Sequence, residues 1–319
     1  MPSPRSRALP SEAARPSLVD RLEYAFFSLA FGLFAALPRR AAVRLGAWVG
    51  ELFYLADVRD RQVALLNLSI AFPDKTLAER QRILRASSRN LGRTAAEICH
   101  LPRLDLSTLP QYVSFADRTA WEHTIERAAH SGTVILTAHF GNWELLAYAQ
   151  GLLGHPITLV HRPMRNALVE AAITALRSRA GTQAINKLAA ARAALRVLKN
   201  GGMLVIPSDQ NQRYSFGVFI ELFGKLACTN PGAARLAMLT GAPVVPVFLV
   251  RDGESERHRI EVLPDVEMIT TGDRDADIRT NTQRCSNVIE DMLRRYPEQW
   301  IWFHKRWKTR PVGEPAVYS

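Results

Sequence analysis

The chain has 319 residues, 47% of them hydrophobic and 22% charged, a composition that excludes a disordered protein and allows one large folded domain. Its formal net charge of +11 favours an anionic partner, either a nucleic acid or an acidic membrane surface. Three widely spaced cysteines, Cys99, Cys228 and Cys285, form no CxxC pair, so we expect reduced thiols in a cytosolic setting and no structural zinc.

The N-terminal region begins with residues 1–21, which are rich in Pro, Ser and Arg and predict a flexible basic tail. Residues 24–37 follow without a charge, but this run is shorter than the roughly 20 apolar residues that a spanning helix needs. A second apolar stretch, 45–56, carries three aromatic residues typical of membrane interfaces. We therefore expect membrane-associated helices within 22–60, lying in the interface or dipping into the bilayer. A core helix and a signal peptide are the alternatives.

Residues 76–100 have the apolar spacing of one amphipathic helix, opened by a capping box between Thr76 and Glu79. After residue 112, short apolar runs alternate with helical patterns, which predicts an α/β fold with a mostly parallel central sheet flanked by helices. The predicted strands are 133–138, 157–161, 203–208, 244–250 and 258–263. The predicted helices are 143–153, 165–179, 187–199, 230–240 and 277–295. One α/β domain should therefore occupy 61–311, followed by a C-terminal tail at 312–319.

The segment TAHFGNWE, residues 137–144, completes the first of these strands. It would place His139 at the carboxyl edge of the sheet, where open α/β folds bind their ligands. Gly141 permits a tight turn, and Asn142 suits the N-cap of the following helix. Glu144 could then hydrogen-bond one imidazole nitrogen and leave the other as a general base. The alternative is that Glu144 only completes a cap and His139 is an ordinary loop residue.

The spacing of this pair says little by itself, because His100 and Asp105 share it without a preceding strand or a glycine turn. Neither a GxSxG elbow nor a nearby cysteine accompanies His139, so the pair suits direct transfer. The base would remove a proton from an acceptor hydroxyl, which then attacks an activated acyl or phosphoryl donor. HExxH is absent, and His155 and His161 have no clear ligand partners, so we assign no metal.

Polar segments also follow two later strands. Arg162, in VHRPMRN, could hold a phosphate or a carboxylate, or be an ordinary surface arginine. Asp209 and Gln210 follow in VIPSDQNQ, where Asp209 could orient a cation such as Arg162 or cap its own loop. Last, residues 297–311 interleave three tryptophans with basic residues, which fits single-stranded nucleic acid or a membrane surface equally well. The apolar N-terminus favours the membrane.

Six segments stand in an order typical of one known family: TAHFGNWE, HRPMRN, IPSDQNQ, LFGKLACTNPGAARLA, APVVPVFLVR and YPEQWIWFHKRWKTRP. Over roughly residues 20–311 the chain resembles the bacterial lipid A late acyltransferases (lauroyl/myristoyl transferases), within the lysophospholipid acyltransferase superfamily. The resemblance implies a glycerol-3-phosphate acyltransferase-like fold with an N-terminal membrane-associated helical segment. It also implies an enzyme of the bacterial inner membrane whose active site is on the cytoplasmic side. Such an enzyme moves a fatty acyl chain from acyl carrier protein to a hydroxyl or hydroxyacyl group of a lipid A precursor.

By this resemblance His139 is the general base and Glu144 its partner, with no covalent acyl-enzyme. Arg162 and Asp209 fall at positions linked to binding of substrate phosphate or to support of the active site. The other expected substrate-binding residues, of which the last four would shape the acyl and acceptor pockets, are Asn142, Gln210, Phe223, Gly224, Thr229 and Pro246. No cofactor is implied, because acyl carrier protein or coenzyme A supplies the acyl group as a thioester.

Three alternatives remain open at this stage. Relatives with the same signature acylate other glycolipids or lysophospholipids, for which acyl-CoA is a donor. A hydrolase would use water in place of a lipid alcohol, and a basic nucleic-acid-binding protein would use the C-terminal segment. The partners expected of the acyltransferase are acyl carrier protein or a coenzyme A thioester, an anionic glycolipid acceptor and a membrane, but no nucleic acid.

Overall fold

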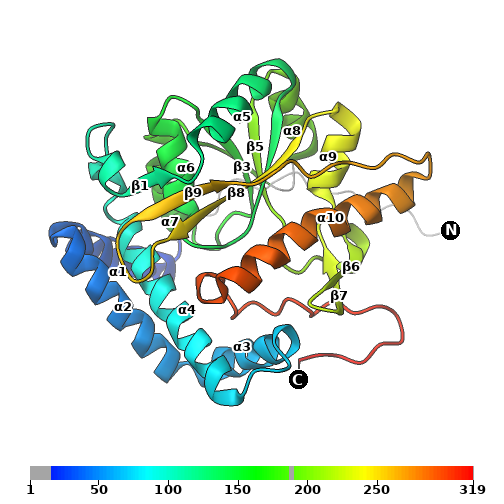
Figure 1. Cartoon of the computed structure of the whole chain (residues 1–319). Coiled ribbons are helices and arrows are strands. Elements are labelled where there is room, and N and C mark those ends of the chain that lie inside the picture. Colours follow the sequence, from blue (N-terminus) through cyan, green and yellow to red (C-terminus); the bar gives the residue numbers. More distant parts are fainter. Residues whose placement is uncertain (1–15, 187–189, 319) are drawn as a thin grey trace.

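A twisted sheet forms the centre of the protein, whose computed structural model describes residues 16–186 and 190–318 (Figure 1). The strands are β1 Val113–Phe115, β2 Thr133–Thr137, β3 Ile157–His161, β4 Gln183–Asn186, β5 Met203–Pro207, β6 Val218–Leu222, β7 Lys225–Thr229, β8 Val244–Arg251 and β9 His258–Val262. Seven of them form one sheet in the order β1-β9-β8-β2-β5-β3-β4. The five strands from β8 to β4 run parallel to their neighbours, while β9 is antiparallel to β8 and β1 is parallel to β9. The predicted α/β fold with a mostly parallel sheet is confirmed.

Helices cover both faces of the sheet. They are α1 Leu18–Ala36, α2 Arg39–Ala56, α3 Val58–Ala71, α4 Leu77–Ile98, α5 Arg118–Ser131, α6 Trp143–Leu152, α7 Ala167–Ser178, α8 Ala190–Lys199, α9 Gly232–Thr240 and α10 Arg274–Arg295. Side chains alternate across β2, because successive residues of a strand point to opposite faces. Val134 and Leu136 therefore pack with α8, α9 and α10, whereas Ile135 packs with α5, α6 and α7. Every residue of β2 and β8 is buried, as is usual for central strands covered on both sides.

The register of the sheet determines where the loops after each strand meet. β2 and β5 are paired along their whole length, so Thr137 lies opposite Pro207 at the carboxyl edge. The Ser208 backbone N–H donates to the Thr137 carbonyl at 3.1 Å, which extends this pairing past the strand ends. Consequently the loop that follows β2 and the loop that follows β5 leave the sheet side by side.

Apolar periodicity located five strands and most helices, and Thr76 caps α4 through the predicted capping box with Glu79. It missed β1, β4, α5, the β6–β7 hairpin and most of α3. The first two are short strands at the two ends of the sheet, and α5 is largely polar with three buried residues. The hairpin turns on Phe223 and Gly224, which both have positive φ, as a two-residue type I′ turn requires.

The N-terminal helices differ from the prediction in two respects. Helix α1 begins at Leu18, so the flexible tail predicted for residues 1–21 is too long, and residues 1–15 lie outside the described part. Likewise 187–189, the start of a predicted helix, lies outside the described residues, and α8 is described from Ala190. Over the described ranges, no helix combines the length and the apolar character needed to cross a bilayer.

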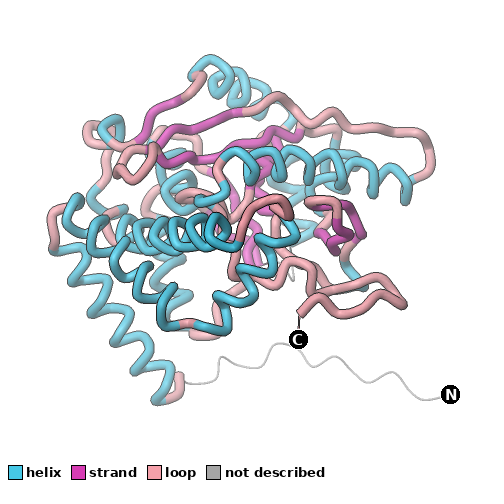
Figure 2. Tube along the Cα trace, turned by 60° about the horizontal axis from the view of Figure 1, so that its bottom comes forward, coloured by secondary structure: helices cyan, strands magenta, loops and turns pink. Residues whose placement is uncertain are grey.

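Helix α4 anchors the N-terminal helices to the sheet domain. α2 crosses α4 so closely that a Cβ added to Gly46 would lie 2.4 Å from the Gly92 carbonyl oxygen. Figure 2, turned to bring the lower side forward, shows these helices in cyan on one side of the molecule. The long pink loop before the C-terminus passes the β6–β7 hairpin, and the Trp307 indole donates to the Lys225 carbonyl there.

Candidate active site

His139 lies two residues beyond β2, at the carboxyl edge predicted from the sequence, and its side chain is 27% exposed. Its Nδ1 is 2.9 Å from Oδ1 of Asp209, a residue in the adjacent loop after β5. Asp209 is buried and its carboxylate can only accept, so Nδ1 carries the proton and donates to it. The lone pair of a neutral imidazole is then on Nε2, 3.4 Å from the side-chain nitrogen of exposed Gln210. The geometry therefore presents a base at the surface of the site.

Glu144 does not make the predicted hydrogen bond to His139. It is buried in the first turn of α6, and its carboxylate accepts from both Nε and Nη2 of Arg177 at 2.9 and 2.5 Å. Arg177 projects from α7, and a bidentate guanidinium outcompetes an imidazole for a carboxylate. Glu144 still acts on His139 through its charge, which raises the imidazole pKa by a smaller amount than Asp209 does.

The expected contact between Asp209 and Arg162 is also absent. Arg162 follows β3 and is exposed, whereas both oxygens of the Asp209 carboxylate are occupied by His139 and by the Trp300 indole. β5 lies between β2 and β3 in the sheet, so the loop that carries Asp209 has the loop after β2 on one side and the loop after β3 on the other. The Asp209 carboxylate contacts His139 in the loop after β2. The sequence could therefore predict that Asp209 orients a neighbouring side chain, but the expected cation, Arg162, is not that partner.

The turn between His139 and α6 is hydrogen-bonded to a buried ion pair, Glu97 with Arg251. Asn142 caps α6 as predicted, by accepting from the Leu145 N–H, and its amide donates to Glu97 Oε2 at 2.8 Å. Glu97 is fully buried on α4 and is held by both terminal nitrogens of Arg251 from β8 at 2.7 and 2.8 Å. Burial alone raises the Glu97 pKa, but Arg251 and His258 outweigh it, so the pKa lies far below its usual value.

The C-terminal segment reaches the other side of Asp209. Trp300 Nε1 donates to Asp209 Oδ2 at 2.8 Å, and His304 Nε2 accepts from the Asn211 backbone N–H at 2.9 Å. Arg306 is almost completely buried and donates to the Thr229 hydroxyl at 2.5 Å. The prediction that this segment's aromatic and basic residues form a nucleic-acid or membrane surface is therefore wrong for Trp300, Trp302, Trp307 and Arg306, which are all buried. They support the loops of the site from inside.

Three titratable groups have shifted pKa values in this region. Burial lowers the pKa of His139, but the charge and hydrogen bond of Asp209 outweigh it and raise that pKa above its usual value. Burial raises the pKa of Asp209, but His139 and the Trp300 indole lower it to about 2. Burial lowers the pKa of His304 to about 4, so His304 is neutral at pH 7. General-base catalysis uses the neutral form of the His139 imidazole, with the ionised Asp209 beside it to stabilise the imidazolium that forms.

The remaining predicted pocket residues lie on the β6–β7 hairpin and on β8. Phe223 and Gly224 form the hairpin turn, where Phe223 packs against Trp302, and Thr229 is buried at the end of β7. Pro246 is inside β8, paired with Leu136. Sequence reasoning did not single out Arg177, Glu97 or Arg251, and it assigned Trp300 and Arg306 to a surface, because a buried role for an arginine or a tryptophan leaves no local spacing signal. In the described residues, no three His, Cys, Asp or Glu side chains lie close enough to hold a metal ion.

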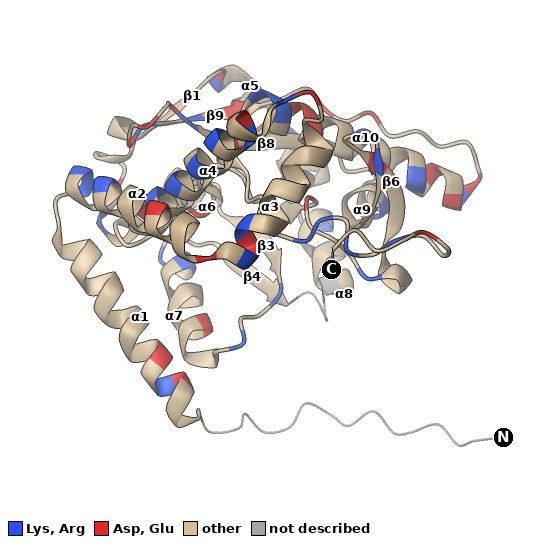
Figure 3. Cartoon of the chain, turned by 90° about the horizontal axis from the view of Figure 1, so that it is seen from below, with Lys and Arg blue, Asp and Glu red and all other residues tan. Residues whose placement is uncertain are grey.

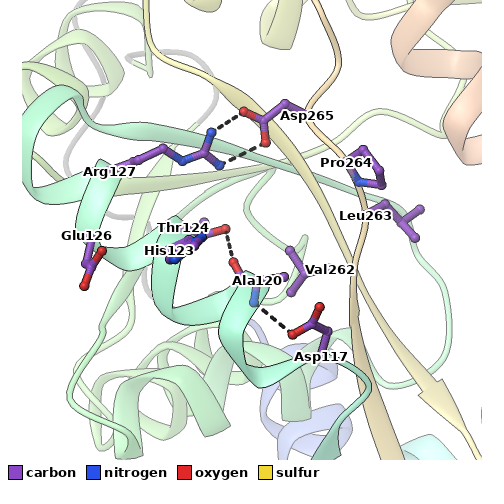
Figure 4. Close-up of a pocket in the computed structure, with 10 residues that line it drawn as sticks. All are labelled: Asp117, Ala120, His123, Thr124, Glu126, Arg127, Val262, Leu263, Pro264 and Asp265. Carbon is purple, nitrogen blue, oxygen red and sulfur yellow. Dashed lines mark hydrogen bonds and ion pairs between the residues drawn. The ribbon is translucent and has the colours of Figure 1, made fainter.

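A cavity of about 640 Å³ lies at the opposite edge of the sheet (Figure 4). It is bordered by α5 and by the loop after β9, and the ion pair between Arg127 and Asp265 spans it at 2.5 Å. Because β9 is antiparallel to β8, this loop leaves the sheet at the amino ends of the parallel strands. The cavity is thus separated by the length of a strand from the base.

Comparison with known proteins gives a consistent result. Residues 15–309 match the family described as bacterial lipid A biosynthesis acyltransferase. The lipid A biosynthesis palmitoleoyltransferase of Escherichia coli (strain K12) is 28% identical over 292 residues, covering 90% of this chain and 91% of that protein. The lauroyltransferase of the same strain is 26% identical over 291 residues, with coverage of 90% and 91%. Its myristoyltransferase is 24% identical over 276 residues, with coverage of 86% and 82%.

Proposed function

The chain belongs to the bacterial lipid A biosynthesis acyltransferase family, and we propose that it transfers a fatty acyl group from acyl carrier protein to a hydroxyl of a lipid A precursor with His139 as general base. The contact between His139 Nδ1 and Asp209 Oδ1 carries this proposal. It leaves Nε2 unprotonated, and Nε2 accepts only a long hydrogen bond of 3.4 Å from the exposed Gln210 side chain, which an acceptor hydroxyl can displace. The acyl chain attached to the carrier protein is a thioester, which needs no further activation.

The reaction we propose is a direct transfer. Nε2 of His139 takes the proton of the acceptor hydroxyl while its oxygen attacks the thioester carbonyl carbon. The imidazolium that forms is stabilised by the Asp209 carboxylate. When the C–S bond breaks, the imidazolium returns the proton to the departing thiolate, so the products are the new ester and the free thiol. His139 ends in its starting tautomer because Asp209 keeps the proton on Nδ1.

The substrate-binding roles of Arg162 and of Glu144 are part of the proposal. Arg162 is exposed at the end of β3, two strands from His139, and can contact a phosphate of the acceptor. Glu144, in the first turn of α6, forms a largely buried ion pair with Arg177. We propose that this pair lines the site beside the bound acceptor. The Glu144 charge acts on His139 electrostatically, by raising its pKa.

We further propose that α1 and α2 rest on the cytoplasmic face of the inner membrane. None of the residues of α1 is buried. Its exposed apolar residues recur at helical spacing and are Leu18, Leu22, Phe26, Leu29 and Leu33. α2 has a second exposed stripe of Leu45, Trp48, Val49 and Leu52, next to exposed Arg44. Figure 3 shows α1 projecting from the body with charges only near its amino end. Two exposed apolar stripes with an adjacent cation suit an interface with anionic lipids.

The decisive experiment compares lipid A and phospholipids by mass spectrometry from cells that lack this gene and carry either the wild-type gene or His139→Ala. One additional acyl chain on lipid A with the wild type alone supports the proposal, and its mass reports the chain length. A change confined to phospholipids or to another glycolipid would instead support a different acceptor. Purified enzyme with acyl carrier protein thioester or acyl-CoA then identifies the donor, and hydrolysis that dominates with acceptor present would contradict transfer.

A further inference from the structure

Trp300 connects two parts of the site that are far apart in sequence. Its indole N–H donates to Asp209 Oδ2 at 2.8 Å, while the other carboxylate oxygen holds His139. Its backbone forms an antiparallel bridge with Phe140, the residue after His139. Trp300 is 2% exposed, and its carbonyl accepts from the Ser87 hydroxyl of α4 at 2.6 Å. Two contacts thus hold the Trp300 backbone, and a third links its indole to Asp209.

On this basis, and resting on the proposed general-base function, we propose that Trp300 is a positioning residue for the base. Its indole N–H fixes the plane of the Asp209 carboxylate and shares its negative charge, and thereby sets the orientation and basicity of His139. An indole N–H donates only and does not ionise at physiological pH, so this contact has the same form at every stage of the reaction.

The other titratable groups that face Asp209 keep one charge state near neutral pH, so His139 is the group we expect to titrate there. His304 and Arg306, on the same C-terminal segment as Trp300, both face Asp209; burial holds His304 neutral and Arg306 remains a cation. Glu144 faces His139 from α6 and is paired with Arg177 of α7. Without the indole hydrogen bond, Asp209 retains more of its charge toward His139, so the protonated imidazole is stabilised and the base titrates at higher pH.

The test compares Trp300→Phe with Trp302→Phe in the full-length protein. Trp302 is a matched control, since it is also fully buried and packs edge-on against Trp300, but its indole donates to the Pro297 carbonyl. The imidazole of His139 is titrated by NMR, with its signal assigned by its loss in His139→Ala. We expect Trp300→Phe to move the midpoint upward by about 0.5 to 1 unit and to lower kcat about tenfold with little change in KM. Trp302→Phe should leave the midpoint in place. Equal midpoints in the two variants would overturn the proposal.

A second measurement needs no substitution of Trp300. In the wild-type protein the Trp300 indole N–H resonance should shift with the same midpoint as His139, because both donate to one carboxylate, and the Trp302 resonance should not. A Trp300 resonance that stays constant through the His139 titration would contradict the proposal. Neither titration requires turnover. An inactive wild-type enzyme with these shifts would therefore reject the proposed function alone, whereas an active enzyme without them would reject only the role of Trp300.

Discussion

The Glu144 carboxylate lies within 2.9 Å of two Arg177 nitrogens, although Glu144 is only five residues from His139 along the chain. The short separation in sequence suggested a hydrogen-bonded catalytic pair. In the folded protein Arg177 reaches Glu144 from α7, and the imidazole turns toward Asp209 instead. Two carboxylates therefore act on one histidine, one by direct contact and the other through its charge.

The pairing of Glu144 with Arg177 predicts strongly coupled substitutions. Glu144→Gln and Arg177→Met should each lower acyl transfer and stability, and the double variant should be little worse than either. We expect a coupling energy of about 1 to 3 kcal/mol, because each single change leaves a buried partner unpaired. A double-mutant cycle on kcat/KM and on the denaturation midpoint measures it. Additive losses would show that Glu144 acts independently of Arg177.

Asp209 should matter more for turnover than Glu144. In Asp209→Asn the side-chain N–H₂ can donate to Nδ1, which moves the imidazole proton to Nε2 and removes the base. We expect kcat to fall about 10²- to 10⁴-fold with KM nearly unchanged, since Asp209 is buried beneath His139. Asp265→Asn, at the cavity on the opposite sheet edge, is the control and should retain wild-type kcat. Comparable losses in both variants would argue for a general folding defect.

The rate should rise with pH through the titration of His139. Asp209 outweighs burial and raises the pKa of His139 above 6.5, and only the neutral imidazole accepts a proton. The acid limb of kcat/KM should therefore have its midpoint above pH 6.5, and the residual activity of Asp209→Asn should extend to lower pH. The stabilisation that comes with this raised pKa is present below pH 6.5 and is lost as pH rises through the folded value. An acid limb below pH 6 in the wild type would contradict the assignment.

The buried ion pair between Glu97 and Arg251 predicts a large loss of stability on substitution. Glu97→Gln leaves Arg251 without its carboxylate, and we expect the free energy of unfolding to fall by about 3 to 5 kcal/mol. Glu254→Gln is the matched control, because Glu254 accepts from Arg93 at 2.9 Å but is 69% exposed. Its loss should be about 0 to 1 kcal/mol. Denaturant unfolding of the three proteins decides the matter, and similar midpoints would mean that the buried pair adds little.

Membrane binding should depend on the exposed stripe of α1. Leu29 and Leu33 are each more than 60% exposed, and replacing both by Glu should weaken co-sedimentation with anionic vesicles about tenfold or more. Leu239→Glu, which changes an equally exposed leucine on α9, should leave binding unchanged. Equal binding by all three proteins would place the membrane contact elsewhere.

Local features of the sequence were enough to place the first half of the site. The apolar run before His139, the glycine turn and the Asn142 cap each act over a few residues, and the structure reproduces them as β2, the turn and α6. Apolar periodicity likewise found the central strands, because burial on both faces leaves continuous apolar runs. The ordered segments identified the family for the same reason, since each is a short contiguous pattern.

The partner of His139 depends on how strands and loops pack in the folded chain. Asp209 is 70 residues away, and Trp300 a further 91, so no local spacing reports that the three side chains meet. Their contact depends on which strand lies beside β2 and on where the C-terminal segment crosses the sheet edge. Local sequence patterns thus established that a histidine stands at a strand end. Strand order and burial decided which carboxylate it contacts, because a buried carboxylate accepts from whichever donors the packing brings within reach.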